Sequence, residues 1–86
     1  MHLEIVTPDE KVFEGEVESA TFPGSDGSFQ ILGDHAPMIS TLGTGDIKLI
    51  HDIDKKSQEI HFMVSGGMLE VRNNKVIVLA ERITTE

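Results

Sequence analysis

The stretch Gln58-Glu59-Ile60-His61-Phe62-Met63-Val64-Ser65 alternates between two kinds of side chain. Ile60, Phe62 and Val64 occupy every second position, and the residues between them are mostly polar. Because a β-strand turns successive side chains to opposite faces, this period of two predicts a strand with one buried face. The same alternation recurs less regularly at residues 3–7 and 45–51, so the sequence predicts an all-β fold.

Turn-forming residues separate these runs at short intervals. Asn73-Asn74 divides residues 68–72 from residues 75–80, and since asparagine tolerates a positive φ, the pair predicts a tight two-residue hairpin. Residues 54–57, Asp-Lys-Lys-Ser, predict a polar turn. Pro8 is expected to close the first strand, because proline cannot donate to a sheet ladder.

Two further segments refine the expected sheet. Gly66-Gly67 lies between strand-like segments, where glycine marks a bulge or a corner. Lys75–Ala80 is apolar on both faces, which predicts a strand covered on both sides. No window of eleven or more residues has helical periodicity, so many short strands predict a single β-sandwich or flattened barrel over residues 1–86.

Length and charge exclude several classes of function. The chain has 86 residues, no cysteine, and 7 basic against 15 acidic residues, for a net charge of −8. A nucleic-acid backbone or an anionic bilayer would repel such a surface. Disulfides and thiolate metal sites are excluded, and the sequence has neither a signal peptide nor an apolar run of the ~20 residues that span a bilayer. We expect a soluble, cytosolic protein.

Residues 22–45 depart from the simple alternation, with two of the three prolines and five of the eight glycines. One interpretation is a pair of tight turns around a short strand at Ser28–Leu32. The other is a binding surface on a rigid scaffold. Phe29, near the tip of a loop, must either tuck inward or meet a partner.

Motifs spread along the chain carry a family resemblance. They are Leu3-Glu4-Ile5-Val6-Thr7-Pro8, Val12-Phe13-Glu14-Gly15-Glu16-Val17, Pro23-Gly24 with Gly27, His35-Ala36-Pro37, Leu42 with Gly45, Val64-Ser65-Gly66-Gly67, and Glu70-Val71 with Val76-Val78-Leu79-Ala80. In this order the chain resembles the epsilon subunit of F-type ATP synthases. It departs from the family pattern at Gln30, usually glycine, and at Gly33, usually proline. The sequence also stops at Glu86, before the family's C-terminal helical hairpin, as either a naturally short form or a domain of a longer chain would.

The resemblance implies a ten-stranded sandwich of two five-stranded sheets. It also implies a non-catalytic rotor subunit of the central stalk that fastens the gamma subunit to the c ring, so that proton-driven rotation is coupled to ATP synthesis. Such a subunit carries no cofactor and lies on the cytoplasmic face of the energy-transducing membrane, held there by the complex. In the family, the hairpin is associated with inhibition of ATP hydrolysis. Without it, the subunit would hold gamma on the c ring and would not inhibit hydrolysis.

The resemblance also implies contact residues at the matched positions. The gamma side comprises Thr7, His35, Ala36, Pro37 and Ser40. The side toward the c ring comprises Asp26, Gly27, Ser28 and Phe29, and the structural turns comprise Pro23, Gly24, Gly66 and Gly67.

Other functions compete with this one. His35 beside Asp34 could suggest a general base, but sequence neighbours rarely supply that geometry, so we expect its ring to bond to turn backbone. His2, His51 and His61 could gather with Asp52 or Asp54 around a metal, although their spacing matches no short motif. The Gly24–Gly27 spacing lacks the lysine and helix of a phosphate loop. We therefore expect no catalytic and no metal site, and the remaining alternative is a free-standing module that binds a protein or a ligand outside a rotary complex.

Overall fold

The computed structural model describes residues 1–53 and 55–85, and within them the chain forms eight strands. These are β1 (His2–Val6), β2 (Lys11–Glu16), β3 (Ser19–Gly24), β4 (Gly27–Leu32), β5 (Met38–Ile53), β6 (Lys56–Arg72), β7 (Lys75–Ala80) and β8 (Ile83–Thr85). In these residues there is no helix that is long and apolar enough to cross a membrane. The all-β class expected from the period of two is confirmed.

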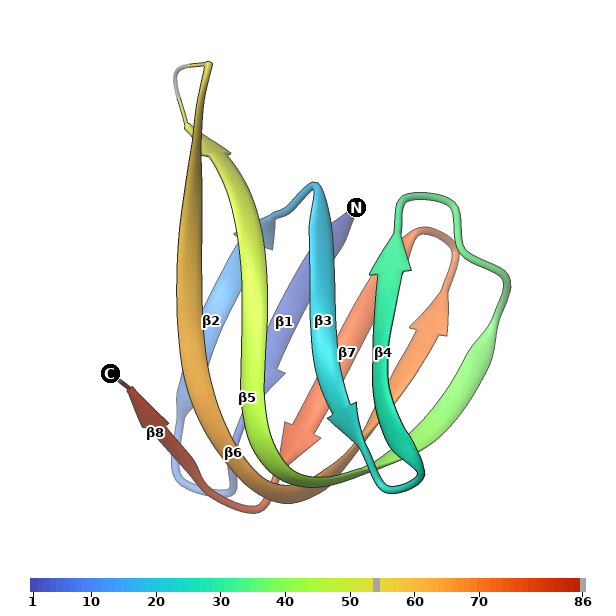
Figure 1. The fold of residues 1–86 in the computed structure, drawn as a ribbon, viewed down its shortest axis with the longest axis vertical. Helices are drawn as coiled ribbons and strands as arrows, with labels where there is room; N and C mark the ends of the chain where they lie inside the picture. Colours follow the sequence, from blue (N-terminus) through green and yellow to red (C-terminus); the bar gives the residue numbers. More distant parts are fainter. Residues whose placement is uncertain (54, 86) are drawn as a thin grey trace.

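The strands form one sheet that folds back on itself into two layers. Its order is β2-β1-β7-β6-β5-β3-β4, with β8 added to β6. β5 and β6 pair along almost their whole length, from Met38 opposite Val71 to Ile53 opposite Lys56. Figure 1 shows these two strands running side by side and curving round one end of the molecule.

The first layer holds β2, β1 and β7 with the second half of β6 and the first half of β5. The second layer holds β8, the first half of β6, the second half of β5, and then β3 and β4. The expected ten strands in two separate sheets become eight in one sheet among the described residues, because β5 and β6 each pass through both layers. Counted by halves, each layer has five members, the number that the family resemblance implied.

The change of layer occurs in β6 at Gly66 and Gly67, which have φ values of 77° and 144°. A Cβ on Gly67 would collide with the carbonyl oxygen of Leu79 and lie 3.0 Å from the Cα of Ala80. Glycine is therefore required here both for its backbone conformation and for the close approach of β7. The expected corner thus lies inside one continuous strand.

The core lies between the layers and follows the period of two. The fully buried large side chains are Leu3, Ile5, Phe22, Ile31, Ile47, Leu49, Val64, Leu69, Val71, Val76 and Val78. Each burial stabilises the fold by about 1.5–3 kcal/mol relative to an exposed side chain. Since inward residues alternate with outward ones, the pattern also determines which side chains each layer presents to solvent.

The turns agree with the sequence in two places and differ in one. Asn73 and Asn74 have φ values of 53° and 60° and join β6 to β7 as the expected two-residue hairpin, and β1 ends at Val6 before Pro8. The four-residue turn expected at 54–57 was too long, because β6 already begins at Lys56, opposite Ile53. Asp54 lies outside the described residues.

Candidate functional site

The outer face of the first layer carries an exposed apolar patch on three neighbouring strands. Ile39 on β5, Met68 on β6 and Leu79 on β7 are 66%, 42% and 51% exposed. The register sets Met68 directly opposite Leu79, and Ile39 opposite Glu70, which in turn pairs with Ile77. Contiguous exposed apolar surface of this kind commonly marks an interaction site. We call Ile39, Met68, Ile77 and Leu79 the apolar face.

This face corrects one sequence expectation. Lys75–Ala80 was expected to be covered on both sides, but only Val76, Val78 and Ala80 are buried. Leu79 faces solvent, because no element among the described residues packs over the outside of β7. The apolar residues on both faces of Lys75–Ala80 were therefore the signal in the sequence that could have identified the exposed apolar face.

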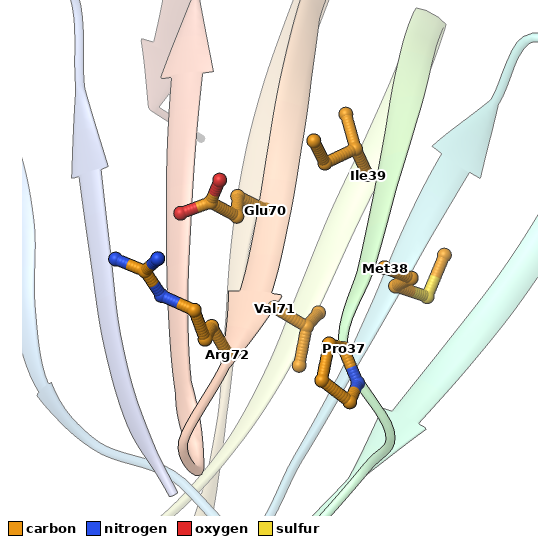
Figure 2. A pocket seen from close by; sticks show the side chains of 6 residues that line it. All are labelled: Pro37, Met38, Ile39, Glu70, Val71 and Arg72. Carbon is orange, nitrogen blue, oxygen red and sulfur yellow. The ribbon is translucent and has the colours of Figure 1, made fainter.

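Hollows follow the apolar face along its length. One of about 330 Å³ lies over its centre and is lined by Ile39, Met68, Leu69, Glu70, Ile77 and Leu79. A second, of about 290 Å³, continues past Leu79 toward Val6 and Thr7. A third, of about 400 Å³, lies at the β5 margin and is lined by Pro37, Met38, Ile39, Glu70, Val71 and Arg72 (Figure 2). All three are open and shallow enough to receive side chains of another protein.

Charged residues border the apolar face. Figure 2 shows Glu70 and Arg72 projecting to one side of β6 and Val71 to the other, as the strand period requires. Arg72 pairs with Lys75 across the β6–β7 hairpin, which places two cations at that end. Such border charges give orientation to an encounter more than affinity.

Two of the five residues expected on the gamma side, Thr7 and Pro37, line hollows at the margins of this face. Thr7 directly follows β1 and lines a hollow with Leu79. Its hydroxyl donates to the Glu10 carbonyl at 3.2 Å and accepts from the Glu10 backbone N–H at 3.2 Å. Pro37 lies at the far margin of the patch, next to Ile39. Ser40, the neighbour of Ile39 on β5, is half-buried, and its hydroxyl lies 3.3 Å from the Thr41 carbonyl oxygen.

His35 and Ala36 are exposed in the loop between β4 and β5. The His35 Nδ1 lies 2.7 Å from the Ala36 carbonyl oxygen, and the Asp34 backbone N–H donates to Asn74 Oδ1 at 2.8 Å. The loop is thereby tied to the β6–β7 hairpin. Among the described residues, no hydrogen bond joins His35 to a carboxylate, so the geometry offers no support for a general base.

The residues expected to face the c ring lie in the turn between β3 and β4 and at the start of β4, at the other end of β4 from the His35 loop. Asp26, Gly27 and Ser28 are exposed, whereas Phe29 tucks inward against Phe22, with ring centroids 5.8 Å apart. Pro23 and Gly24 precede this turn on β3 and lie opposite Ser28 and Gly27. The Ser25 hydroxyl lies 2.9 Å from that of Thr41, which anchors the turn to β5.

The histidines considered for a metal site are not brought together. His51 pairs with Gln58, while His61 pairs with Lys48. The His51 ring lies inside the sandwich against Phe13, with centroids 6.1 Å apart, whereas His61 lies outside between Asp46 and Glu59. The side chain of Asp52 and the whole of Asp54 lie outside the described residues.

Fold and surface together define a class: a two-layer β-sandwich with one apolar outer face, suited to interaction with another protein. The family model described as ATP synthase, Delta/Epsilon chain, beta-sandwich domain matches residues 1–86. The chain therefore belongs to this family, as the motifs in its sequence indicated.

Curated relatives agree with this assignment. The chain is 44% identical to an ATP synthase epsilon chain of Salinibacter ruber over 94% of its own length, and 46% identical to one of Maridesulfovibrio salexigens over 92%. It spans only 58% and 53% of those relatives. An epsilon chain of Chlorobium limicola is 43% identical over 95% of this chain, which spans 90% of that relative.

Solved structures share the fold at lower sequence identity. The central stalk and c ring of the Tetrahymena thermophila mitochondrial ATP synthase contain a chain with a TM-score of 0.78 at 18% identity, covering 98% of this chain and 65% of that one. A chain in the Euglena gracilis mitochondrial ATP synthase gives 0.86 at 19% identity, covering 96% and 51%. These likenesses establish the same sandwich architecture.

Proposed function

We propose that this domain is a non-catalytic central-stalk subunit of an F-type ATP synthase. It fastens a gamma-type subunit to the c ring, so that ion-driven rotation reaches the catalytic sites on other subunits. The names of its curated relatives support this role. The Tetrahymena chain of the same fold, which is part of a central stalk and c ring, supports it as well.

The apolar face is the observation that carries the proposal. Ile39, Met68 and Leu79 lie in one patch, with Thr7 at one end and Pro37 at the other. Burying each large side chain against gamma would stabilise the complex by up to about 1.5–3 kcal/mol. Thr7 and Pro37, two of the five residues expected on the gamma side from the family resemblance, thus lie at the margins of the apolar face.

The β3–β4 turn is the second contact in this proposal. Asp26 and Ser28 offer a carboxylate and a hydroxyl to polar loops of the c ring, and these groups would give orientation. The hydroxyl contact between Ser25 and Thr41 holds the turn in place. Held between gamma and the ring, the domain would lie at the cytoplasmic face of the membrane without entering it.

A binding measurement with purified gamma subunit tests the proposal. We expect Leu79→Asp to weaken binding at least about tenfold, because it would bury an unpaired charge in the interface. Leu32→Asp is the matched control: Leu32 is 56% exposed on β4 in the second layer, so gamma binding should be unchanged. Equal effects of both substitutions would contradict the assignment of the face, and a wild-type chain without affinity for gamma would favour a free-standing module.

Coupling provides the functional readout. Wild-type chain added to vesicles that carry an epsilon-depleted ATP synthase should restore ATP-driven proton pumping. Leu79→Asp should restore less pumping than Leu32→Asp at the same concentration. Pumping that does not respond to the wild-type chain would argue against a fastening role.

A further inference from the structure

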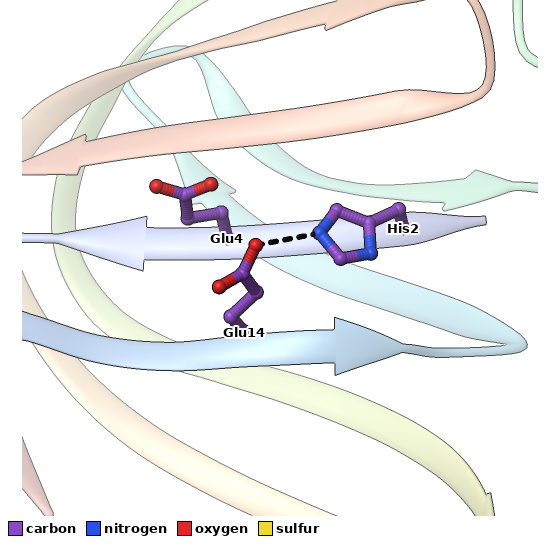
Figure 3. Close-up of side chains that lie close together, drawn as sticks. All are labelled: His2, Glu4 and Glu14. Atoms are coloured by element: carbon purple, nitrogen blue, oxygen red, sulfur yellow. Dashed lines mark hydrogen bonds and ion pairs between the residues drawn. The ribbon is translucent and has the colours of Figure 1, made fainter.

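The outer surface of β1 and β2 carries a cluster of possible metal ligands away from the apolar face. His2 pairs with Glu16 across the two strands, and Glu4 pairs with Glu14. Leu3 and Ile5 point into the core with no exposure, so His2 and Glu4 must both point outward. Figure 3 shows His2, Glu4 and Glu14 gathered on this side of the strands.

The distances within the cluster suit a small divalent ion. His2 Nε2 lies 3.0 Å from Glu14 Oε2, and one ligand atom from each of His2, Glu4 and Glu14 lies within 4.8 Å of the others. Zinc binds nitrogen and oxygen ligands at about 2.0–2.2 Å, and a tetrahedral arrangement separates neighbouring ligand atoms by about 3.3–3.6 Å. The His2–Glu14 pair, at 3.0 Å, is a few tenths of an ångström short of this spacing, so binding needs only changes of side-chain torsion in His2, Glu4 and Glu14.

The backbone beneath the cluster is fixed on both sides. β1 pairs antiparallel with β2 and parallel with β7, so it is an inner strand of its layer. His2 and Glu4 therefore keep their separation, and only side-chain torsions need to adjust on binding. A preorganised set of ligands lowers the entropy cost of coordination.

Cations of the chain itself already gather at these carboxylates. Lys11 Nζ lies 2.8 Å from Glu14 Oε1 and 3.9 Å from Glu4 Oε1, and the amino group of Met1 lies 3.4 Å from Glu16 Oε2. Because Lys11 takes Oε1, the second oxygen remains directed at His2.

We propose that His2, Glu4 and Glu14 form a surface site for a divalent transition-metal ion such as Zn²⁺, with water in the remaining positions. The imidazole selects borderline metals over Mg²⁺ and Ca²⁺, which prefer sites made only of oxygen. Glu16 supports the site from the position directly opposite His2, with Oε1 3.4 Å from His2 Nδ1. This site is independent of the proposed stalk function.

Calorimetric titration of the untagged chain with ZnCl₂ tests the site, with MgCl₂ as a second titrant. We expect one saturable zinc site with a dissociation constant below about 100 µM, and no comparable magnesium binding. His2→Asn should weaken zinc binding at least about tenfold, since it removes the only nitrogen ligand, and Glu14→Gln should also weaken it.

The control is His61→Asn. The two ring nitrogens of His61 face different carboxylates, Asp46 at 2.6 Å and Glu59 at 2.7 Å, so these three groups cannot converge on one ion. Zinc binding should be unchanged in this variant. Backbone amide spectra of each variant verify the fold and show whether zinc perturbs β1 and β2. No saturable binding by folded wild-type chain, or equal affinity in folded His2→Asn, would overturn the proposal.

Discussion

His51 brings a polar ring atom into the interior of the sandwich. Its ring meets Phe13 edge-on, with centroids 6.1 Å apart. Its Nδ1 is buried, with no hydrogen-bond partner among the described residues. A buried polar atom without a partner costs about 1–3 kcal/mol. The position is therefore less stable than its burial alone would suggest.

We expect His51→Phe to raise the free energy of unfolding by about 1 kcal/mol, because it removes the unpartnered nitrogen and keeps a ring against Phe13. Urea denaturation at pH 8 measures the change. His61→Phe, on the outer face of the same layer, is the control and should bring no such gain. A lower free energy of unfolding in His51→Phe would contradict this account, because it would mean that the His51 ring makes a stabilising interaction that phenylalanine cannot replace.

His61 shows the opposite situation on the surface. Hydrogen bonds that the His61 ring donates to the carboxylates of Glu59 and, second, Asp46 raise the pKa of His61 above its usual 6.5. The same contact with His61 is the main cause of the lowered pKa of Glu59. Because the pKa of His61 is raised in the folded state, its contribution to stability is fully present below the pKa that it has in the unfolded chain. That contribution is lost as the pH rises through the pKa of His61 in the folded state. The pKa of the Glu59 carboxyl is lowered in the folded state, so its contribution to stability is lost as the pH falls through that folded-state pKa.

His61→Gln should therefore destabilise the chain more at about pH 5.5 than at about pH 9, where wild type and variant should converge. The difference should be small and should shrink in high salt, because the pair is exposed. Urea unfolding at the two pH values measures it. His35→Gln, which loses only a contact to a backbone carbonyl, should show no such trend, and a pH-independent effect of His61→Gln would contradict this account.

Among the elements, β6 depends most on a single residue type at one point. Gly67 has a φ of 144° and no room for a Cβ next to Leu79. Gly67→Ala should lower the free energy of unfolding by about 3 kcal/mol, from backbone strain together with the collision. Gly27→Ala is a matched control: its φ is 130°, but nothing lies within 4 Å of the added Cβ.

Gly27→Ala should then lose only about 1 kcal/mol, the cost of strain without a collision. Thermal and urea unfolding of the two variants separate these contributions. Equal losses at both positions would mean that the close approach of β7 to β6 contributes little to the bend.

The elements also show what a sequence can predict. Local chemistry is enough for the Asn73-Asn74 hairpin and for the end of β1 before Pro8, because each depends on the backbone preferences of one or two residues. The sequence did not predict the length of the β5–β6 pairing. The bend interrupts the alternating pattern, so each of these strands has the sequence pattern of two shorter strands. The exposure of Leu79 could not be predicted either. The apolar pattern of β7 would be the same whether another element of this chain or a partner protein packed over it.

At the scale of the whole molecule, an apolar face sits on a strongly acidic body. The net charge of −8 keeps copies of the chain apart at neutral pH, and it vanishes near the isoelectric point of about 4.8. We expect reversible self-association near that pH, because charge repulsion is then absent while the apolar face remains exposed.

Sedimentation velocity at pH 4.8 and pH 7.5 measures this association. Leu79→Ser should reduce it, and Leu32→Ser, on the second layer, should reduce it less. If both variants associate like wild type, surfaces other than the apolar face would be responsible.

For the candidate site, the sequence pointed to residues at the margins of the apolar face but not to Ile39 and Met68 within it. Thr7 and Pro37 were identified by family motifs and lie at the margins of the patch. Ile39 and Met68 carry no motif, and they become neighbours of Leu79 only through pairings that join distant parts of the chain. The His2–Glu14 contact was missed for the same reason, because it depends on the register of β1 against β2.

The parallel pairing of β1 with β7 also bears on how the chain is made. His2–Val6 pair with Lys75–Leu79, so β1 cannot gain this neighbour until β7 has been synthesised. Synthesis proceeds at about 5–20 residues per second, so β1 and β2 spend several seconds without their neighbour. The hairpins β3–β4 and β5–β6 join segments close in sequence and can form earlier. The first layer, with its apolar face, can therefore be completed only after β7 has been synthesised.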